Sequence, residues 1–399
     1  MEYSKHAPAD LFSYNTHLHA LSIHSHNDRE YAQRADDILT SLERKYKEGE
    51  ISFRPNVFSY NVVIDAWGRS QDPEGAWNAA KLLRRFISND SKFEPDTFSF
   101  NQVFSALSRS KKPGSTQLAE QLLSYMEIAY SNRNLRNAKA DVVSYTSVII
   151  SLARSGESDS AERGERLLKR LKEQYESAPN VVTYNAVMNS WARSGTRCCG
   201  NMAEKYLDRM IFLNGTKGEI KPNEFTYNTV INAIAKSQSA TKTQKSLRIL
   251  RRMDKLYQSG YKQARPNILT YTSVLNAAAF PSKQSDFKTK RKALDTAIFT
   301  LHELRSSQYG HPTELTYSTF MKACSNLLSS KDETSLREVI EETFHQCKED
   351  GQVGEMFLSR LKEAAPKDLY TSLLSEVVTD RDFVKVDDLP QSWRCNVRN

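Results

Sequence analysis

Eight amide or hydroxyl side chains recur at a regular spacing in this chain of 399 residues, each directly after an aromatic residue. In chain order they are Asn15, Asn61, Asn101, Thr146, Asn185, Asn228, Thr272 and Ser318. Amide and hydroxyl groups both donate and accept hydrogen bonds, so a regular row of them could recognise a ligand whose polar groups also repeat. An Asn, an Asp or, once, a Thr stands four residues before each aromatic residue, which supplies a second polar group beside each member of the row.

These residues belong to a six-residue phrase that recurs eight times, for example as Asn180-Val-Val-Thr-Tyr-Asn185. Successive aromatic residues of the phrase are 39–46 residues apart. Self-similarity at this period is typical of a solenoid, in which each repeat buries its apolar face only against its neighbours. The sequence therefore predicts an all-α, right-handed α-solenoid of about eight helix-turn-helix repeats.

The phrase is expected to open the first helix of each repeat. Tyr60, Val63 and Trp67 share one apolar helical face, and Asn56 precedes them with the chemistry of a helix N-cap. A polar turn and a second apolar helix should follow. An apolar landmark residue of that second helix stands 26 residues after the aromatic residue in five repeats, as Phe86, Met126, Leu171, Met210 and Met253.

We expect three parts along the chain. Residues 1–328 should form the repeat array, residues 329–378 atypical closing helices, and residues 379–399 a C-terminal tail or cap. A longer helix or an insertion is expected around residues 281–285. Met1 occupies the place of a second-helix landmark, so we expect the chain to begin partway through a repeat, with any targeting leader upstream.

Composition limits the classes of partner and cofactor. A net charge of +8 and an isoelectric point near 9.0 favour an acidic partner such as nucleic acid. A mean hydropathy of −0.61 and the lack of a long apolar run exclude a membrane span. The five cysteines show neither metal-ligand spacing nor disulfide density, and we expect no cofactor or metal. Four histidines of the first repeat are too divergent on a helix to form a metal site: His17, His19, His24 and His26.

The phrase and its flanks resemble the repeat of pentatricopeptide repeat proteins. The resemblance rests on Val182-Thr-Tyr-Asn185 and on the closing dipeptides Pro95-Asp96 and Pro222-Asn223, and it covers about residues 1–328. These repeats are longer than the usual repeat of the family. The resemblance implies that single-stranded RNA binds with about one base per repeat, read by two or three side chains. Tetratricopeptide and HEAT repeats are the alternatives of similar architecture.

The resemblance also implies which residues select bases: the residue after the aromatic residue and the last residue of the same repeat. The pairs are Asn15/Asn56, Asn61/Asp96, Asn101/Asp141, Thr146/Asn180, Asn185/Asn223, Asn228/Asn267 and Thr272/Thr313, and Ser318 has no identifiable partner. Family preferences give uridine for Asn with Asp, adenine for Thr with Asn and a pyrimidine for Asn with Asn. With the N-terminus at the RNA 5′ end, the implied target core is Y-U-U-A-Y-Y.

Two further rows are expected to contact RNA. The second residue of each first helix should stack on or wedge between bases, the alternative being packing between repeats: Phe12, Phe58, Phe98, Val143, Val182, Phe225, Leu269 and Leu315. A basic row should contact phosphates, the alternative being interaction with the helix C-terminal dipole: Arg69, Arg109, Arg154, Arg193 and Lys236.

Together these features predict a monomeric RNA-binding adaptor that is not itself an enzyme and that acts in RNA processing, stability, editing or translation. A protein effector is an expected second partner, and by resemblance the location is a mitochondrion or a plastid. Two alternatives stay open. One is a protein-interaction scaffold, and the other is an RNA-processing enzyme whose catalytic domain is absent, since the residues after Ser330 hold no metallonuclease or zinc-deaminase motif.

Overall fold

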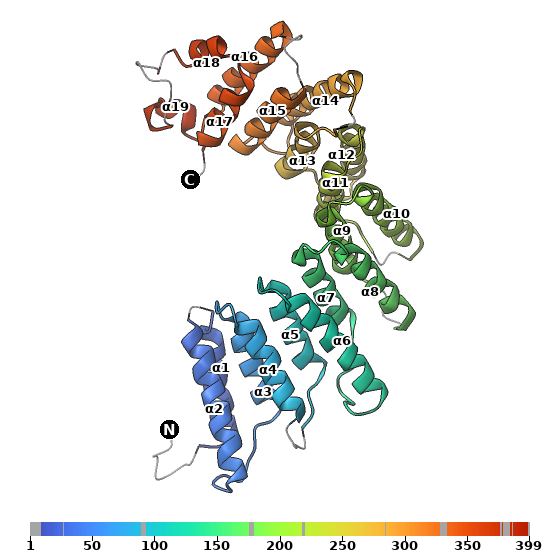
Figure 1. Ribbon diagram of the computed structural model, residues 1–399, viewed down its shortest axis with the longest axis vertical. Coiled ribbons are helices and arrows are strands. Elements are labelled where there is room, and N and C mark those ends of the chain that lie inside the picture. Colours follow the sequence, from blue (N-terminus) through green and yellow to red (C-terminus); the bar gives the residue numbers. More distant parts are fainter. Residues whose placement is uncertain are drawn as a thin grey trace. The chain divides into compact units, whose positions relative to one another are not determined.

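The computed structural model describes residues 9–397 except 27, 89–92, 175–178, 218–219, 284, 328–332, 376, 378–383 and 385. These described residues form helices joined by turns and contain no strand (Figure 1). They divide into two compact units, residues 1–190 and 191–399. The predicted all-α solenoid class is confirmed by the paired helices within each unit.

In the first unit, helices that open with the phrase alternate with second helices. Their bounds are α1 (Leu11–His24), α2 (Arg29–Lys47), α3 (Val57–Arg69), α4 (Gly75–Ser88), α5 (Thr97–Arg109), α6 (Ser115–Ser131), α7 (Val142–Ser155) and α8 (Ser160–Gln174). The first helices α1, α3, α5 and α7 pack side by side in chain order, and α2, α4 and α6 each also pack on the first helix that follows. Helix α9 (Val181–Ser194) crosses the boundary between the units.

The second unit repeats this arrangement. Its helices are α10 (Cys199–Lys217), α11 (Glu224–Lys236), α12 (Lys242–Gln258), α13 (Ile268–Ala279), α14 (Phe287–Ser306), α15 (Glu314–Leu327), α16 (Glu333–Glu349), α17 (Glu355–Ala364), α18 (Lys367–Leu373) and α19 (Gln391–Arg394), with short 3-10 turns η1 (Lys262–Ala264) and η3 (Val386–Asp388). The first helices α11, α13, α15 and α17 pack side by side. Helix α14, with 20 residues, is the lengthened helix expected after residues 281–285.

Capping chemistry explains where the first helices begin. The Asn56 side chain accepts a hydrogen bond from the Ser59 N–H at 3.0 Å, and the Ser59 hydroxyl accepts one from the Asn56 N–H at 3.2 Å. The same capping box opens the helices that follow Asp96, Asp141, Asn223 and Asn267. Each cap satisfies backbone donors that a helix terminus leaves open, and loss of such a cap costs about 1 kcal/mol. The phrase therefore fixes the start of each first helix.

The aromatic residue of the phrase forms the centre of the core. Six of these tyrosines are at most 1% exposed: Tyr60, Tyr145, Tyr184, Tyr227, Tyr271 and Tyr317. The landmark residues of the second helices are buried with them, and the rings of Tyr60 and Phe86 stack with centroids 3.9 Å apart. Each repeat thus buries its two predicted apolar faces against each other and against its neighbours.

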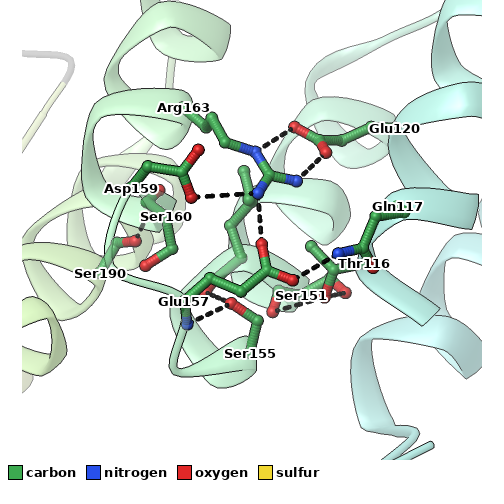
Figure 2. Close-up of polar contacts among 11 residues, drawn as sticks. Thr116, Gln117, Glu120, Ser151, Ser155, Glu157, Asp159, Ser160, Arg163 and Ser190 are labelled. Atoms are coloured by element: carbon green, nitrogen blue, oxygen red, sulfur yellow. Dashed lines mark hydrogen bonds and ion pairs between the residues drawn. The ribbon is translucent and has the colours of Figure 1, made fainter. Parts of the chain in front are cut away.

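Ion pairs join successive second helices. Figure 2 shows Arg163 of α8 in contact with Glu120 of α6 and with Glu157 and Asp159, which directly precede its own helix. Hydrogen bonding to Glu120 raises the pKa of the Arg163 guanidinium, which is therefore always charged. Gln117 of α6 also donates to Glu157 at 2.5 Å, so the contact fixes α6 against α8 through both charge and amide.

The C-terminal helices continue the stack. Helix α17 packs against α15 as α15 packs against α13, within the segment where we expected atypical closing helices. Trp393 of α19 is 3% exposed and lies edge-on to Phe344 of α16, with ring centroids 5.7 Å apart. The part boundaries expected at 328 and 378, and Met1, lie outside the described residues.

Candidate nucleic-acid interface

The second residue of each first helix that opens with the phrase is an exposed apolar side chain. Its exposed fraction runs from 49% for Phe58 to 77% for Phe12. The eight residues, here called the apolar row, are Phe12, Phe58, Phe98, Val143, Val182, Phe225, Leu269 and Leu315. Phe58 also contacts His19 of the preceding repeat, with ring centroids 6.4 Å apart, yet about half of each side chain in the row stays exposed. An apolar side chain at the same exposed position of every repeat is a surface available to an apolar or aromatic ligand face.

The polar side chains after the aromatic residues lie deeper than expected. We placed them at the solvent edge, but Asn61, Thr146 and Asn228 are only 7–9% exposed. Asn185, Thr272 and Ser318 are buried as well, while Asn15 and Asn101 are half-buried. The reason is that the next first helix packs against this position and covers most of the side chain.

Two of the predicted pairs are in direct contact. Asn61 Nδ2 donates to the Asp96 carboxylate at 3.4 Å, and Asn101 Nδ2 donates to the two oxygens of Asp141 at 3.2 and 3.4 Å. A carboxylate only accepts hydrogen bonds, so it fixes the NH₂ side of each amide. The structure therefore brings together the two residues of each Asn/Asp pair.

Three further pairs are bridged by a hydroxyl group. Ser59 Oγ lies 2.6 Å from Asn15 Oδ1 and 3.0 Å from Asn56 Oδ1. Thr183 Oγ1 lies 2.7 Å from Thr146 Oγ1 and donates to Asn180 Oδ1 at 3.1 Å. In the seventh repeat the corresponding bridge runs from Thr272 through Thr316 to Thr313, with distances of 3.0 and 3.2 Å.

We call the residue after each aromatic residue of the phrase the reading residue. The other three reading residues each have a polar atom without a hydrogen-bond partner among the described residues. These atoms are Asn185 Oδ1, Asn228 Oδ1 and Ser318 Oγ. Asn267, the predicted partner of Asn228, instead donates its amide hydrogen to Glu224. Asn185 and its predicted partner Asn223 belong to different units. An unpartnered buried polar atom costs free energy, which a hydrogen bond from a ligand would offset.

The basic row is exposed, and its first three members also have structural partners. Arg109 donates to the carbonyl of Gly68 at 3.0 Å, and Arg154 donates to the carbonyl of Ser108 at 2.8 Å. These carbonyls lie at the C-terminal end of the preceding first helix, where positive charge is favourable. Burial lowers the pKa of Arg109; the charge of Asp65 opposes this shift, and the charges of Arg154 and Arg69 add to it. Three arginines that repel one another mark a positive strip.

Asn326 shows that this position has a structural role independent of charge. In the eighth repeat it donates to the carbonyl of Ala279 at 2.6 Å, in the same way as the arginines. Arg69 is 55% exposed and pairs with Asp65 at 2.7 Å, while Arg193 and Lys236 are exposed. The helix-end interaction and a phosphate contact are therefore compatible at one side chain.

Sequence reasoning missed the residues that bridge the pairs. They are third residues of the first helices, which we interpreted only as helix-start chemistry; the five that contact the preceding repeat are Ser59, Ser99, Ser144, Thr183 and Thr316. The signal was present, because Ser or Thr occurs at this place in every copy of the phrase.

The sequence also raised the questions of a metal site and of a membrane span. Among the described residues, no group of three or more His, Cys, Asp or Glu is placed to hold a metal ion. Two histidines of α1 make ring contacts: His19 with Phe58 and His24 with Tyr31, with centroids 6.4 and 5.7 Å apart. No described helix combines the length and the apolar character needed to cross a membrane.

Comparison with known proteins identifies the class. Residues 131–193 match the family model of the pentatricopeptide repeat domain. The chain is similar to the crystal structure of the pentatricopeptide repeat protein PPR10 from maize, with 22% identity and a TM-score of 0.51, over 95% of this chain and 51% of that chain. PPR10 in complex with an 18-nt psaJ RNA element is 18% identical, with a TM-score of 0.28, over 94% of this chain and 64% of that chain. No curated protein matches this chain.

The paired helices, and the apolar and polar positions repeated on the first helices, define a helical-repeat protein of the α-solenoid class. Its resemblance to the pentatricopeptide repeat family is confirmed by the matched segment and by the shared fold. The chain spans about half the length of the maize structure.

Proposed function

We propose that this protein binds single-stranded RNA along the N-terminal turns of its first helices, with one base per repeat. The observation that carries the proposal is the apolar row, whose eight members are each 49–77% exposed. Stacking of a base on an aromatic side chain, available at Phe12, Phe58, Phe98 and Phe225, contributes roughly 1–3 kcal/mol per base, whichever base is present, and the Val and Leu members offer an apolar surface to the base face. The row therefore offers affinity that is independent of sequence.

Base choice comes from the polar pairs beside the apolar row. The Asn61/Asp96 and Asn101/Asp141 pairs are preorganised by direct hydrogen bonds, which supports uridine at the second and third nucleotides. Each remaining pair contributes an amide or a hydroxyl at the same place in its repeat. The proposed target core is Y-U-U-A-Y-Y, read from the RNA 5′ end with the N-terminus of the chain.

The basic row supplies the electrostatic part of binding. Arg69, Arg109 and Arg154 leave exposed guanidinium surface beside the strand, while Phe280 and Asn326 occupy this position in the last two repeats. Phosphate contacts are therefore strongest in the middle five repeats, and binding weakens as salt rises.

Occupation of a single-stranded segment is the mode of action. A bound segment is protected from nucleases and cannot form a hairpin, which affects RNA processing, stability, editing or translation without catalysis by this chain. A protein effector is the second partner in this proposal, and a mitochondrion or plastid is the proposed location. A protein-interaction scaffold remains the second candidate, favoured by apolar groups that are exposed on this edge.

One experiment separates the two functions. The full chain is titrated with fluorescent single-stranded RNA carrying U-U or C-C at nucleotides 2 and 3, at stated salt. Asn61→Ala with Asn101→Ala should reduce the preference for U-U by about tenfold or more, because each specific base contact contributes about 1–3 kcal/mol. Asn201→Ala, at an exposed amide on α10, serves as the control and should leave the preference unchanged. An equal preference in parent and double variant contradicts base reading and favours a scaffold.

A further inference from the structure

The hydroxyl residue at the third position of each first helix differs between the early and late repeats. It is Ser59, Ser99 and Ser144 in the second to fourth repeats and Thr183, Thr226, Thr270 and Thr316 in the fifth to eighth. All seven residues are 0% exposed. Each belongs to the repeat that follows the reading residue and therefore lies outside the base-selecting pair.

A serine at this position fixes the amide of the preceding reading residue. Ser99 Oγ lies 2.6 Å from Asn61 Oδ1 and also accepts the Asp96 N–H at 3.2 Å. Asp96 accepts from Nδ2 of Asn61 and Ser99 donates to its Oδ1, so a flip of the amide would set its oxygen against the Asp96 carboxylate. Ser144 holds Asn101 in the same way, at 2.7 Å.

The first repeat separates the effect of serine from that of aspartate. Its pair is Asn15/Asn56, without a carboxylate, and Ser59 Oγ still lies 2.6 Å from Asn15 Oδ1. Serine therefore engages the reading amide whether or not an acidic partner is present.

A threonine at this position leaves the amide oxygen open. Thr270 Oγ1 donates to Asn267 Oδ1 at 3.0 Å and accepts the Asn267 N–H at 3.1 Å, the same cap contacts that Ser99 makes with Asp96 at 2.9 and 3.2 Å, but it does not also hydrogen-bond to the reading residue of the preceding repeat. Asn228 is 9% exposed, and its Oδ1 has no partner among the described residues. Threonine does reach the preceding repeat where the reading residue is the shorter Thr146 or Thr272.

We infer that this buried hydroxyl residue is a positioning residue for base choice, so that each base is read by three side chains and not by two. The inference rests on the proposed function. Where serine occupies the amide oxygen, the reading Asn presents its N–H to the base. Uracil offers a carbonyl acceptor where cytosine offers an amino donor, so a serine-held Asn selects U over C. Where threonine leaves the oxygen open, the amide accepts from cytosine as well as donating to uracil.

This inference assigns bases differently from the pair alone. The Asn15/Asn56 and Asn228/Asn267 pairs are the same two residue types, yet the first is followed by Ser59 and the second by Thr270. Nucleotide 1 should therefore be uridine, while nucleotide 6 should accept either pyrimidine.

The test replaces Thr by Ser at position 270, or Ser by Thr at position 99, in the full chain, so that each variant differs from the parent by one methyl group. Synthetic single-stranded RNAs that differ only by U or C at nucleotide 1, 2 or 6 are titrated, and the ratio of the two dissociation constants is measured. Thr270→Ser should raise the preference for U at nucleotide 6 by about fivefold or more, within the range of one specific contact. Ser99→Thr should lower the preference for U at nucleotide 2 by a similar factor. Total affinity for poly-U should change little, because the apolar row is untouched.

The matched control is Thr371→Ser, the same exchange at an exposed threonine of α18, outside the first helices; the preferences at nucleotides 2 and 6 should be unchanged. Thermal unfolding verifies that each variant is folded, which is expected because both residue types occur naturally at this position. Suppose that RNA is still bound and that the parent still prefers U at nucleotide 2. If the ratios of dissociation constants are then unchanged in both Thr270→Ser and Ser99→Thr, this inference is overturned while the proposed function stands. A parent chain that binds RNA without any base preference overturns the proposed reading function, and the inference with it.

Discussion

The hydroxyl of the buried tyrosine finds its hydrogen-bond acceptor in different places in the early and late repeats: before the tyrosine's helix in the early repeats and after it in the late ones. In the early repeats, Tyr145 of α7 donates to Glu127 of the preceding second helix α6, and Arg170 of the following α8 pairs with the same carboxylate. In the late repeats, Tyr317 of α15 donates at 2.5 Å to Asp350, which follows the next second helix, α16. Arg305 of the preceding α14 pairs with Asp350 at 3.2 Å.

The order of charges is therefore reversed. Glu43 and Arg85 follow the early order around Tyr60, and Glu303 and Arg251 follow the late order around Tyr271. Helix α12 is where the order changes: its Arg252 pairs with Asp208 of α10, and its Arg251 pairs with Glu303 of α14. A buried hydroxyl needs an acceptor and a buried carboxylate needs a positive partner, but neither requirement specifies the helix. Because like charges would meet, repeats from the two regions are not interchangeable.

The largest expected effect is loss of an early carboxylate. Glu127 has an 8% exposed side chain, so Glu127→Ala should destabilise the chain by about 3 kcal/mol, because Tyr145 and Arg170 lose a buried charged partner. Glu303, 23% exposed, should cost less when replaced by alanine. Urea unfolding measures both, with Glu173→Ala as the exposed control. Equal losses for Glu127→Ala and Glu303→Ala would remove the distinction between the two regions.

A smaller effect is expected from the tyrosine hydroxyls. Tyr145→Phe should cost about 2 kcal/mol, since a hydrogen bond to a charged group contributes about 1.5–3 kcal/mol. The Tyr227 hydroxyl has no hydrogen-bond partner among the described residues, so Tyr227→Phe should cost nothing. Phe100, which is 0% exposed, shows that the ring alone fits this place. A loss from Tyr227→Phe as large as that from Tyr145→Phe would show that its hydroxyl has a stabilising partner.

The sequence predicted the repeat well because its signals are local. Asn56 and Asp96 cap the helices at the places predicted, and the apolar faces of Tyr60 and Trp67 are buried. Burial of Asn61 was not predicted, since it depends on how closely the next first helix approaches. The continuation of the stack by α17 was also missed, because Glu355-Met-Phe-Leu-Ser359 keeps the packing without the phrase.

The candidate site was predictable in part for the same reason. The apolar row follows from its position in the phrase, and Phe58 and Leu315 are exposed as a helix-start position allows. The contacts of Ser99 and Thr270 across repeats were not predictable, because both residues satisfy the same local cap. Which of them also reaches the preceding repeat depends on one methyl group and on tertiary packing.

A further difference concerns charge on the reading side. Arg109 combines a carbonyl contact with a positive charge, whereas Asn326 makes the same contact without charge. Arg109→Gln should weaken RNA binding equally for all sequences and reduce the log–log salt slope by about 1. Asn326→Ser should leave the slope unchanged. Titrations at several salt concentrations measure both variants, and an unchanged slope for Arg109→Gln would assign that arginine to the helix end alone.

The smallest effect is an alkaline one in the second unit. Burial raises the pKa of Tyr227 to about 12, above the ordinary value of about 10 for a tyrosine. The unfolded chain therefore releases this proton first, so the contribution of Tyr227 is fully present below pH 10 and is lost as pH rises towards 12. Tyr227→Phe should lose less stability than the parent between pH 10 and 12, as measured by urea unfolding at each pH. Identical pH profiles for the two chains would mean that the Tyr227 hydroxyl titrates as it does in water, contrary to its burial.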